Sequence, residues 1–148
     1  MRLGILHEAQ HDSFIDFLAE VHGFYNNGAL ISRQSVQDHL LGNLLCANSP
    51  HCLAVASTAD HTVVGLAALT LVFSPVDFHP NQRKHCQLKE LYVRLPFRSA
   101  GVGRALMSWV ANLLLKIDVT GSIGQSRQQT RAESRSTKNS EPCWSLIA

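Results

Sequence analysis

Residues 88–116 read LKELYVRLPFRSAGVGRALMSWVANLLLK, and this stretch decides the fold. Its first part alternates Leu91 and Val93 with polar neighbours, which is the period-two pattern of a β-strand. Pro96 interrupts that pattern, and a glycine-containing loop follows. After the loop, apolar residues recur at the spacing of a helix that buries one face: Val102, Ala105, Leu106, Trp109, Val110, Leu113, Leu114 and Ile117. The stretch therefore predicts a strand, a short loop and a helix in succession.

The loop at residues 98–103 reads RSAGVG and has the pattern R-x-x-G-x-G. Its glycines leave backbone N–H groups uncovered at a helix N-terminus, where the helix dipole favours an anion. This predicts a cradle for a diphosphate. The alternative is an ordinary strand-to-helix turn whose glycines supply positive φ angles. The dinucleotide pattern G-x-G-x-x-G is not met, because Leu106 stands where its last glycine belongs.

The unit formed by ELYV at 90–93, Pro96, Phe97-Arg98, both glycines and the RALM sequence at 104–107 resembles motif A of the GNAT superfamily of N-acetyltransferases. This resemblance implies that acetyl-CoA is the co-substrate. It implies that the loop and the start of the helix hold the diphosphate, through Arg98, Ser99, Ala100, Gly101, Val102, Gly103 and Arg104. It also implies that the backbone of Leu91 and Val93 pairs with the pantetheine arm, and that an N–H near Tyr92 or Val93 polarises the thioester carbonyl.

Glu90 is the candidate catalytic base, because the resemblance places a carboxylate in this strand to take a proton from the amine. The alternative is a solvated or salt-bridged strand residue, paired with Lys89 or Arg94. Tyr92 is not assigned as the acid, since the acid of the family lies on a later helix.

The chain on the N-terminal side of this unit predicts the order strand, helix, helix, strand, strand, strand, helix. Strands are expected at 2–6, 51–57, 62–73 and 86–94, and Gly65 within the third marks a bulge or a close backbone approach. Asp12 or Ser13 is expected to cap the first helix and Ser32 the second. The predicted fold is α/β of the α+β kind, a mixed but mainly antiparallel sheet flanked by helices, as the resemblance implies for residues 1–119.

The composition changes after residue 119. Residues 120–141 contain almost no apolar side chains, so we expect a polar, disordered tail over 120–148. The fifth strand, fourth helix and closing hairpin of the family find no match there. The sequence thus predicts an N-terminal domain that lacks the C-terminal part of the family, with activity in doubt and a homodimer that could complete the sheet.

These observations support an N-acetyltransferase that moves an acetyl group from acetyl-CoA to a primary amine of a small molecule or protein. One alternative is a catalytically impaired GNAT fragment that binds CoA or dimerises. A remote alternative comes from His7-Glu8-Ala9-Gln10-His11, which matches the H-E-x-x-H pattern of zinc hydrolases. That pattern requires a position inside a helix, whereas a helix start is expected just after it, so no metal site is predicted.

The composition sets further limits on the function. The net charge is +2, and no basic stripe with interleaved aromatic residues predicts a nucleic-acid partner. No stretch reaches membrane-spanning length. The four cysteines show no zinc-site spacing and indicate reduced thiols in a cytoplasmic protein.

Overall fold

The computed structural model describes residues 1–79 and 84–116. Its helices and strands follow the predicted order: β1 (Arg2–Ile5), α1 (His11–Tyr25), α2 (Arg33–His39), β2 (His51–Ser57), β3 (Val63–Phe73), β4 (Lys84–Val93) and α3 (Val102–Lys116). The expected polar tail at 120–148, and the question of a fifth strand, lie outside the described residues.

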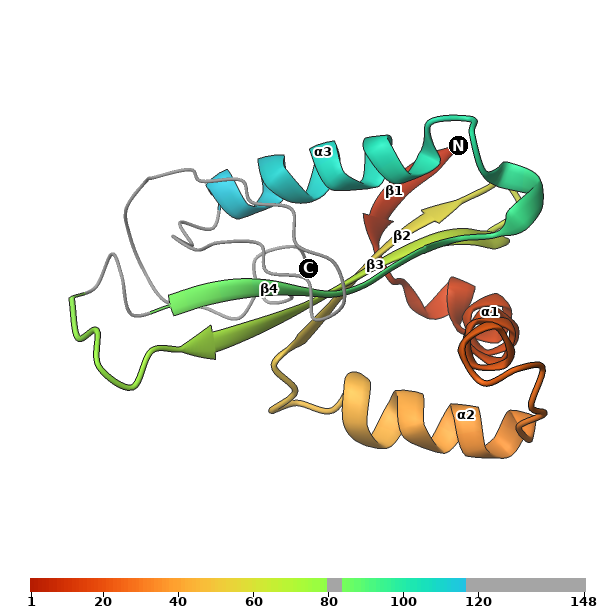
Figure 1. Ribbon diagram of the computed structural model, residues 1–148, viewed down its shortest axis with the longest axis horizontal. Helices are drawn as coiled ribbons and strands as arrows, with labels where there is room; N and C mark the ends of the chain where they lie inside the picture. The colour runs from red at the N-terminus through yellow and green to blue at the C-terminus, as the bar shows by residue number, and fades with distance from the viewer. Residues whose placement is uncertain (80–83, 117–148) are drawn as a thin grey trace.

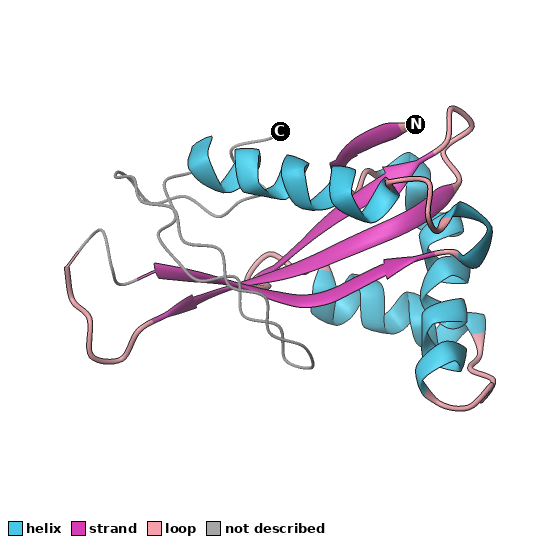
Figure 2. Ribbon diagram, turned by 45° about the horizontal axis from the view of Figure 1, so that its top comes forward, coloured by secondary structure: helices cyan, strands magenta, loops and turns pink. Residues whose placement is uncertain are grey.

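The four strands form one antiparallel sheet in the order β1-β2-β3-β4. Figures 1 and 2 show α3 over one face of this sheet and α1 with α2 over the other. The predicted α+β class is therefore confirmed. Within the described ranges, β4 pairs only with β3, so its second edge is open.

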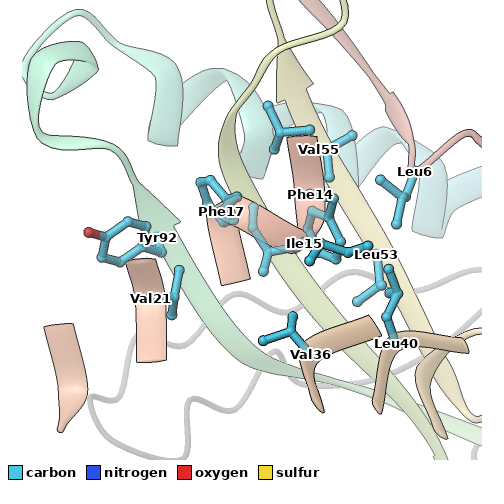
Figure 3. Close-up of a cluster of buried hydrophobic side chains, with 12 residues drawn as sticks. Leu6, Phe14, Ile15, Phe17, Val21, Val36, Leu40, Leu53, Val55 and Tyr92 are labelled. Atoms are coloured by element: carbon cyan, nitrogen blue, oxygen red, sulfur yellow. The ribbon is translucent and has the colours of Figure 1, made fainter. Parts of the chain in front are cut away.

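The α1 face of the sheet holds an aromatic core. Phe14 and Phe17 are fully buried, and their rings stack with centroids 5.9 Å apart. The ring of Tyr92 on β4 meets that of Phe17 edge to face, with centroids 5.6 Å apart. Figure 3 labels both residues within this cluster of buried side chains. Each buried aromatic side chain contributes about 1.5–3 kcal/mol through the hydrophobic effect. This core fixes the position of α1, and hence of the residues at its C-terminal end, relative to β4.

The opposite face packs against α3, whose Leu106 and Val110 are fully buried. Gly65 on β3 lies directly beneath this helix. A Cβ atom at Gly65 would stand 3.0 Å from Leu106 Cδ1 and 3.2 Å from Val102 Cγ1. The prediction that Gly65 marks a close backbone approach is thus confirmed, and the absent side chain allows the start of α3 to sit close to the sheet.

The predicted start of the first helix was wrong. The helix begins at His11, without a side-chain cap from Asp12 or Ser13. A 3₁₀ turn at Glu8–Gln10, capped reciprocally by His7 and Gln10, leads directly into it. The Ser13 hydroxyl instead accepts a hydrogen bond from the Val63 N–H at 2.8 Å. The hydroxyl that was expected to cap the helix therefore bonds to β3 instead.

The second predicted cap is confirmed, since the Ser32 hydroxyl accepts a hydrogen bond from the Ser35 N–H at 3.1 Å. The regular α-helix ends at His39 and continues as one π-helical turn, Leu40–Leu44. Leu40 is fully buried against the α1 core. This turn completes the cover of the sheet on the α1 side.

Candidate functional site

A pocket of about 680 Å³ opens where β4 ends and α3 begins. Three parts of the chain line it: the C-terminal end of α1, the last residues of β4, and the loop with the first turn of α3. The lining residues are Phe24, Tyr25, Leu91, Tyr92, Val93, Phe97, Arg98, Ser99, Gly101, Val102, Gly103 and Arg104. Every residue predicted to bind acetyl-CoA is among them except Ala100, which lies exposed in the same loop. The structure thus brings nine of the predicted binding residues into one cavity, whereas the predicted base Glu90 is not among its lining residues.

A β-bulge in β4 decides which side chains face the pocket. Ala68 pairs with Glu90, but the next residue of β3, Leu69, pairs with Leu88, so Lys89 is the extra residue. Leu88 packs on the α3 side of the sheet. Strict alternation from Leu88 would place Glu90 on that side as well, whereas the bulge turns Glu90 toward α1. The change of face brings Glu90 to the helix end that lines the pocket.

The loop that precedes α3 has an unusual backbone. Ser99 and Gly101 adopt positive φ angles, +64° and +81° respectively. The Ala105 N–H donates to the Gly101 carbonyl at 2.9 Å, which closes the first turn of α3. The N–H groups of Val102, Gly103 and Arg104 precede this bond and have no acceptor within the helix. An anion in the pocket would meet these donors at the positive end of the helix dipole.

The open edge of β4 presents backbone groups to the same pocket. The Arg94 N–H donates to the Val64 carbonyl on β3 at 2.9 Å. Because successive residues of an antiparallel strand point alternately toward and away from the neighbour, Leu91 and Val93 turn their N–H and C=O groups away from β3. The hydrogen bonding of Val93 is consistent with this direction, because its carbonyl accepts a hydrogen bond from Arg98 Nε at 2.8 Å and not from β3.

Arg98 is exposed, and its side chain lies along the pocket wall. Its guanidinium lies 5.3 Å from the Phe24 ring centroid and 5.2 Å from that of Tyr92, within the range of a cation–π contact. Together with its hydrogen bond to Val93, these contacts tie the loop to β4 and to the end of α1. One acceptor of the open edge, the Val93 carbonyl, is thus already bonded to Arg98.

Two carboxylate–hydroxyl pairs lie on the α1 side of the pocket. The Tyr25 hydroxyl donates to Glu90 Oε1. The Tyr92 hydroxyl donates to Glu20 Oε1 at 3.2 Å, and Glu20 Oε2 lies 3.0 Å from Arg94 Nε. Burial, followed by the nearby Glu20 charge, raises the pKa of Tyr92 above its ordinary value. Tyr92 therefore stays protonated at neutral pH.

Sequence reasoning missed three aromatic residues of the pocket, Phe24, Tyr25 and Phe97. Tyr25 lies at the end of the first helix, and no local pattern links a helix end to a strand residue 65 positions later in the chain. Phe24 bridges the two elements, with its ring 5.1 Å from Tyr25 and 5.3 Å from Tyr92 between centroids. Only the packing of α1 on the sheet shows that these rings border the loop.

The H-E-x-x-H segment lies in the 3₁₀ turn before α1 and not inside a helix. His7 Nδ1 accepts a hydrogen bond from the Ala9 N–H, and the Gln10 amide donates to the Ser57 hydroxyl at 2.9 Å. Among residues 1–79 and 84–116, no three His, Cys, Asp or Glu side chains gather as metal ligands. None of the helices in these ranges combines the length and hydrophobicity needed to cross a bilayer.

Comparisons with known proteins agree with this architecture. A sequence model described as the acetyltransferase (GNAT) family matches residues 11–132. The comparison with curated protein sequences gives no match. Several solved structures share the fold, at sequence identities too low to carry more than the fold.

Three of these structures illustrate the likeness. An integron cassette protein from the mobile metagenome of V. cholerae superposes with a TM-score of 0.69 at 19% identity, over 87% of this chain and 77% of that one. A ribosomal-protein-alanine N-acetyltransferase from Brucella melitensis gives 0.62 at 16% identity, over 88% and 83% of the two chains. A GNAT family acetyltransferase from Staphylococcus aureus gives 0.65 at 11% identity, over 95% and 96%.

Proposed function

This chain belongs to the acetyltransferase (GNAT) family, and on that premise we propose that it moves an acetyl group from acetyl-CoA to a primary amine of a small molecule or protein. The observation that carries the proposal is the pocket of about 680 Å³, in which helix N–H donors and an open strand edge lie together. A CoA thioester has a matching pair of features, a diphosphate and an amide-containing arm.

Acetyl-CoA would be held by two groups of backbone atoms, those of the first turn of α3 and those of the open edge of β4. The N–H groups of Val102, Gly103 and Arg104 would receive the diphosphate oxygens, with the Arg104 side chain adding positive charge. The backbone of Leu91 and Val93 would pair with the pantetheine amides in the manner of an added strand. Arg98 would leave the Val93 carbonyl and become available to the diphosphate.

Glu90 is proposed as the general base. Its carboxylate lies on the α1 side of β4, next to residues that line the pocket, and Tyr25 orients it through a hydrogen bond. Arg94, one of the ion-pair partners considered for Glu90, pairs with Glu20 instead. A carboxylate in this position can take the proton from the amine as the nitrogen attacks the thioester carbonyl.

The approach of the acceptor amine and the cellular location are part of the same proposal. The end of α1 lines the pocket, and its Tyr25 is bonded to the candidate base Glu90, so we propose that the amine approaches there. We expect a cytoplasmic protein because the cysteine pattern indicates reduced thiols. We expect neither nucleic acid nor membrane as a partner, and a homodimer that completes the sheet remains a proposal.

The proposal is tested by calorimetric titration of the full chain with acetyl-CoA, followed by a thiol-release assay with a panel of primary amines. The expected result is saturable binding and release of CoA thiol with at least one amine. Glu90→Gln should lower kcat by roughly 10²–10⁴-fold with little change in the Kd of acetyl-CoA. Glu8→Gln, an exposed change in the 3₁₀ turn, is the matched control. A folded protein without affinity for acetyl-CoA would refute the assignment.

A further inference from the structure

We propose that Tyr25 is the catalytic acid of this enzyme and forms a proton relay with Glu90. The inference rests on the proposed acetyl transfer and adds a residue that the sequence pattern did not identify. The relay carries one proton from the attacking nitrogen, through the carboxylate and the phenol, to the departing sulfur.

The first observation is the hydrogen bond between the Tyr25 hydroxyl and Glu90 Oε1. Tyr25 is the last residue of α1, whereas Glu90 lies in β4 just after the bulge at Lys89. Tyr25 lines the pocket and is 43% exposed, so a bound molecule can reach its ring and hydroxyl. A phenolic oxygen is both donor and acceptor, so it can extend the reach of the carboxylate along the pocket wall.

The second observation separates Tyr25 from Tyr92. These are the two tyrosines of the whole sequence, and both line the pocket. The Tyr92 side chain is buried among aromatic rings, and its hydroxyl donates to Glu20, whose second oxygen lies beside Arg94. Its burial also raises its pKa, which makes proton release harder. Tyr25 is the tyrosine that combines exposure to the pocket with a link to the candidate base.

The position of Tyr25 is held by packing and not by its hydroxyl alone. Its ring lies against Phe24 at 5.1 Å, and Phe24 lies against Tyr92 at 5.3 Å. The Arg98 guanidinium lies over the Phe24 ring, 5.3 Å from its centroid. Removal of the Tyr25 hydroxyl therefore leaves the aromatic packing in place while it breaks the connection to Glu90.

The chemical step balances without another reactant. The neutral amine attacks the carbonyl carbon, so an N–C bond forms, and the C–S bond breaks with its electron pair left on sulfur. The nitrogen loses one proton to Glu90, and Tyr25 gives its proton to the thiolate. Glu90 then returns the proton to the tyrosinate oxygen. The products are an amide and a thiol, and both side chains regain their starting forms.

The test compares Tyr25→Phe with Thr62→Val, which removes a hydroxyl group from a residue that does not line the pocket. Tyr25→Phe should lower kcat by roughly 10- to 100-fold, at the low end of general acid–base effects, with the Kd of acetyl-CoA and the KM of the amine within about threefold of wild type. Thr62→Val should change kcat by less than about threefold. In the double variant with Glu90→Gln, the loss should be much smaller than the product of the single losses, because both residues serve one relay.

Three results would count against the relay. Equal kcat values for Tyr25→Phe and wild type would overturn it, and so would equal losses in Tyr25→Phe and Thr62→Val. Multiplicative losses in the double variant would show that Tyr25 and Glu90 act separately. A wild-type chain that binds acetyl-CoA but transfers no acetyl group would overturn the proposed function together with the relay, so the two failures are distinguishable.

Discussion

Replacement of Gly103 with alanine should stabilise the protein and weaken acetyl-CoA binding at the same time. Gly103 is the second residue of α3, where alanine is favoured over glycine by about 0.5–1 kcal/mol. The nearest atom to the added Cβ would be Val93 Cγ2 at 3.8 Å, an ordinary van der Waals contact. The free energy of unfolding should therefore rise by up to about 1 kcal/mol.

The same methyl group would occupy the pocket in front of the helix N–H donors. Phosphate oxygens must come within about 2.7–3.2 Å of those nitrogens to form hydrogen bonds. The loss of one hydrogen bond to a charged group costs about 1.5–3 kcal/mol, which corresponds to a roughly 10- to 150-fold weaker Kd. A more stable variant that binds more weakly cannot be explained by misfolding.

The assay is urea denaturation together with calorimetric titration of acetyl-CoA on the same preparations. Gly42→Ala is the control, because a Cβ there meets nothing within 4 Å and the residue is remote from the pocket. It should leave the Kd unchanged. If Gly103→Ala bound acetyl-CoA as tightly as wild type, the diphosphate would not lie on the first turn of α3, and the reasoning would be refuted.

Three further predictions concern stability. Gly65→Ala should lower the free energy of unfolding by about 1–3 kcal/mol in urea titrations, because its Cβ would press on Leu106 at 3.0 Å, while Gly4→Ala, with open space around it, should not. Leu106→Ala should cost about 2.7–5 kcal/mol by the same measurement, and a cost under 1 kcal/mol would contradict its place in the core. The pKa of His51 is lowered, first by burial and then by His39 and Lys89, so the unfolded chain binds this proton more readily. Stability should fall as pH drops below about 6.5, and His51→Gln should flatten that fall.

The local patterns of residues 88–116 were sufficient for the strand, the loop and the helix. The predicted pocket residues, apart from Ala100, line one cavity because a strand, a tight loop and a helix in succession leave little freedom in where the loop can go. The helical spacing after Gly101 likewise identified the buried face of α3, including Leu106 and Val110. These features depend on residues near one another in the chain, so the sequence alone reveals them.

The helix start shows where local patterns are insufficient. Ser13 has a residue type typical of a cap, but its hydroxyl bonds the N–H of Val63, 50 residues away. A side chain that could cap a helix can instead bond to any group that the tertiary fold brings near it. The sequence does not show which of these hydrogen bonds forms.

The sequence by itself determined the order of elements, the glycine loop at the start of α3 and the family of the chain. Only the tertiary structure decided that Glu90 faces α1, since one extra residue at Lys89 reverses the side-chain alternation of β4. Packing of α1 on the sheet then brought Tyr25 to Glu90 and Phe24 to Arg98. The physical reason is that strand register and helix docking depend on contacts between distant segments, which no local pattern encodes.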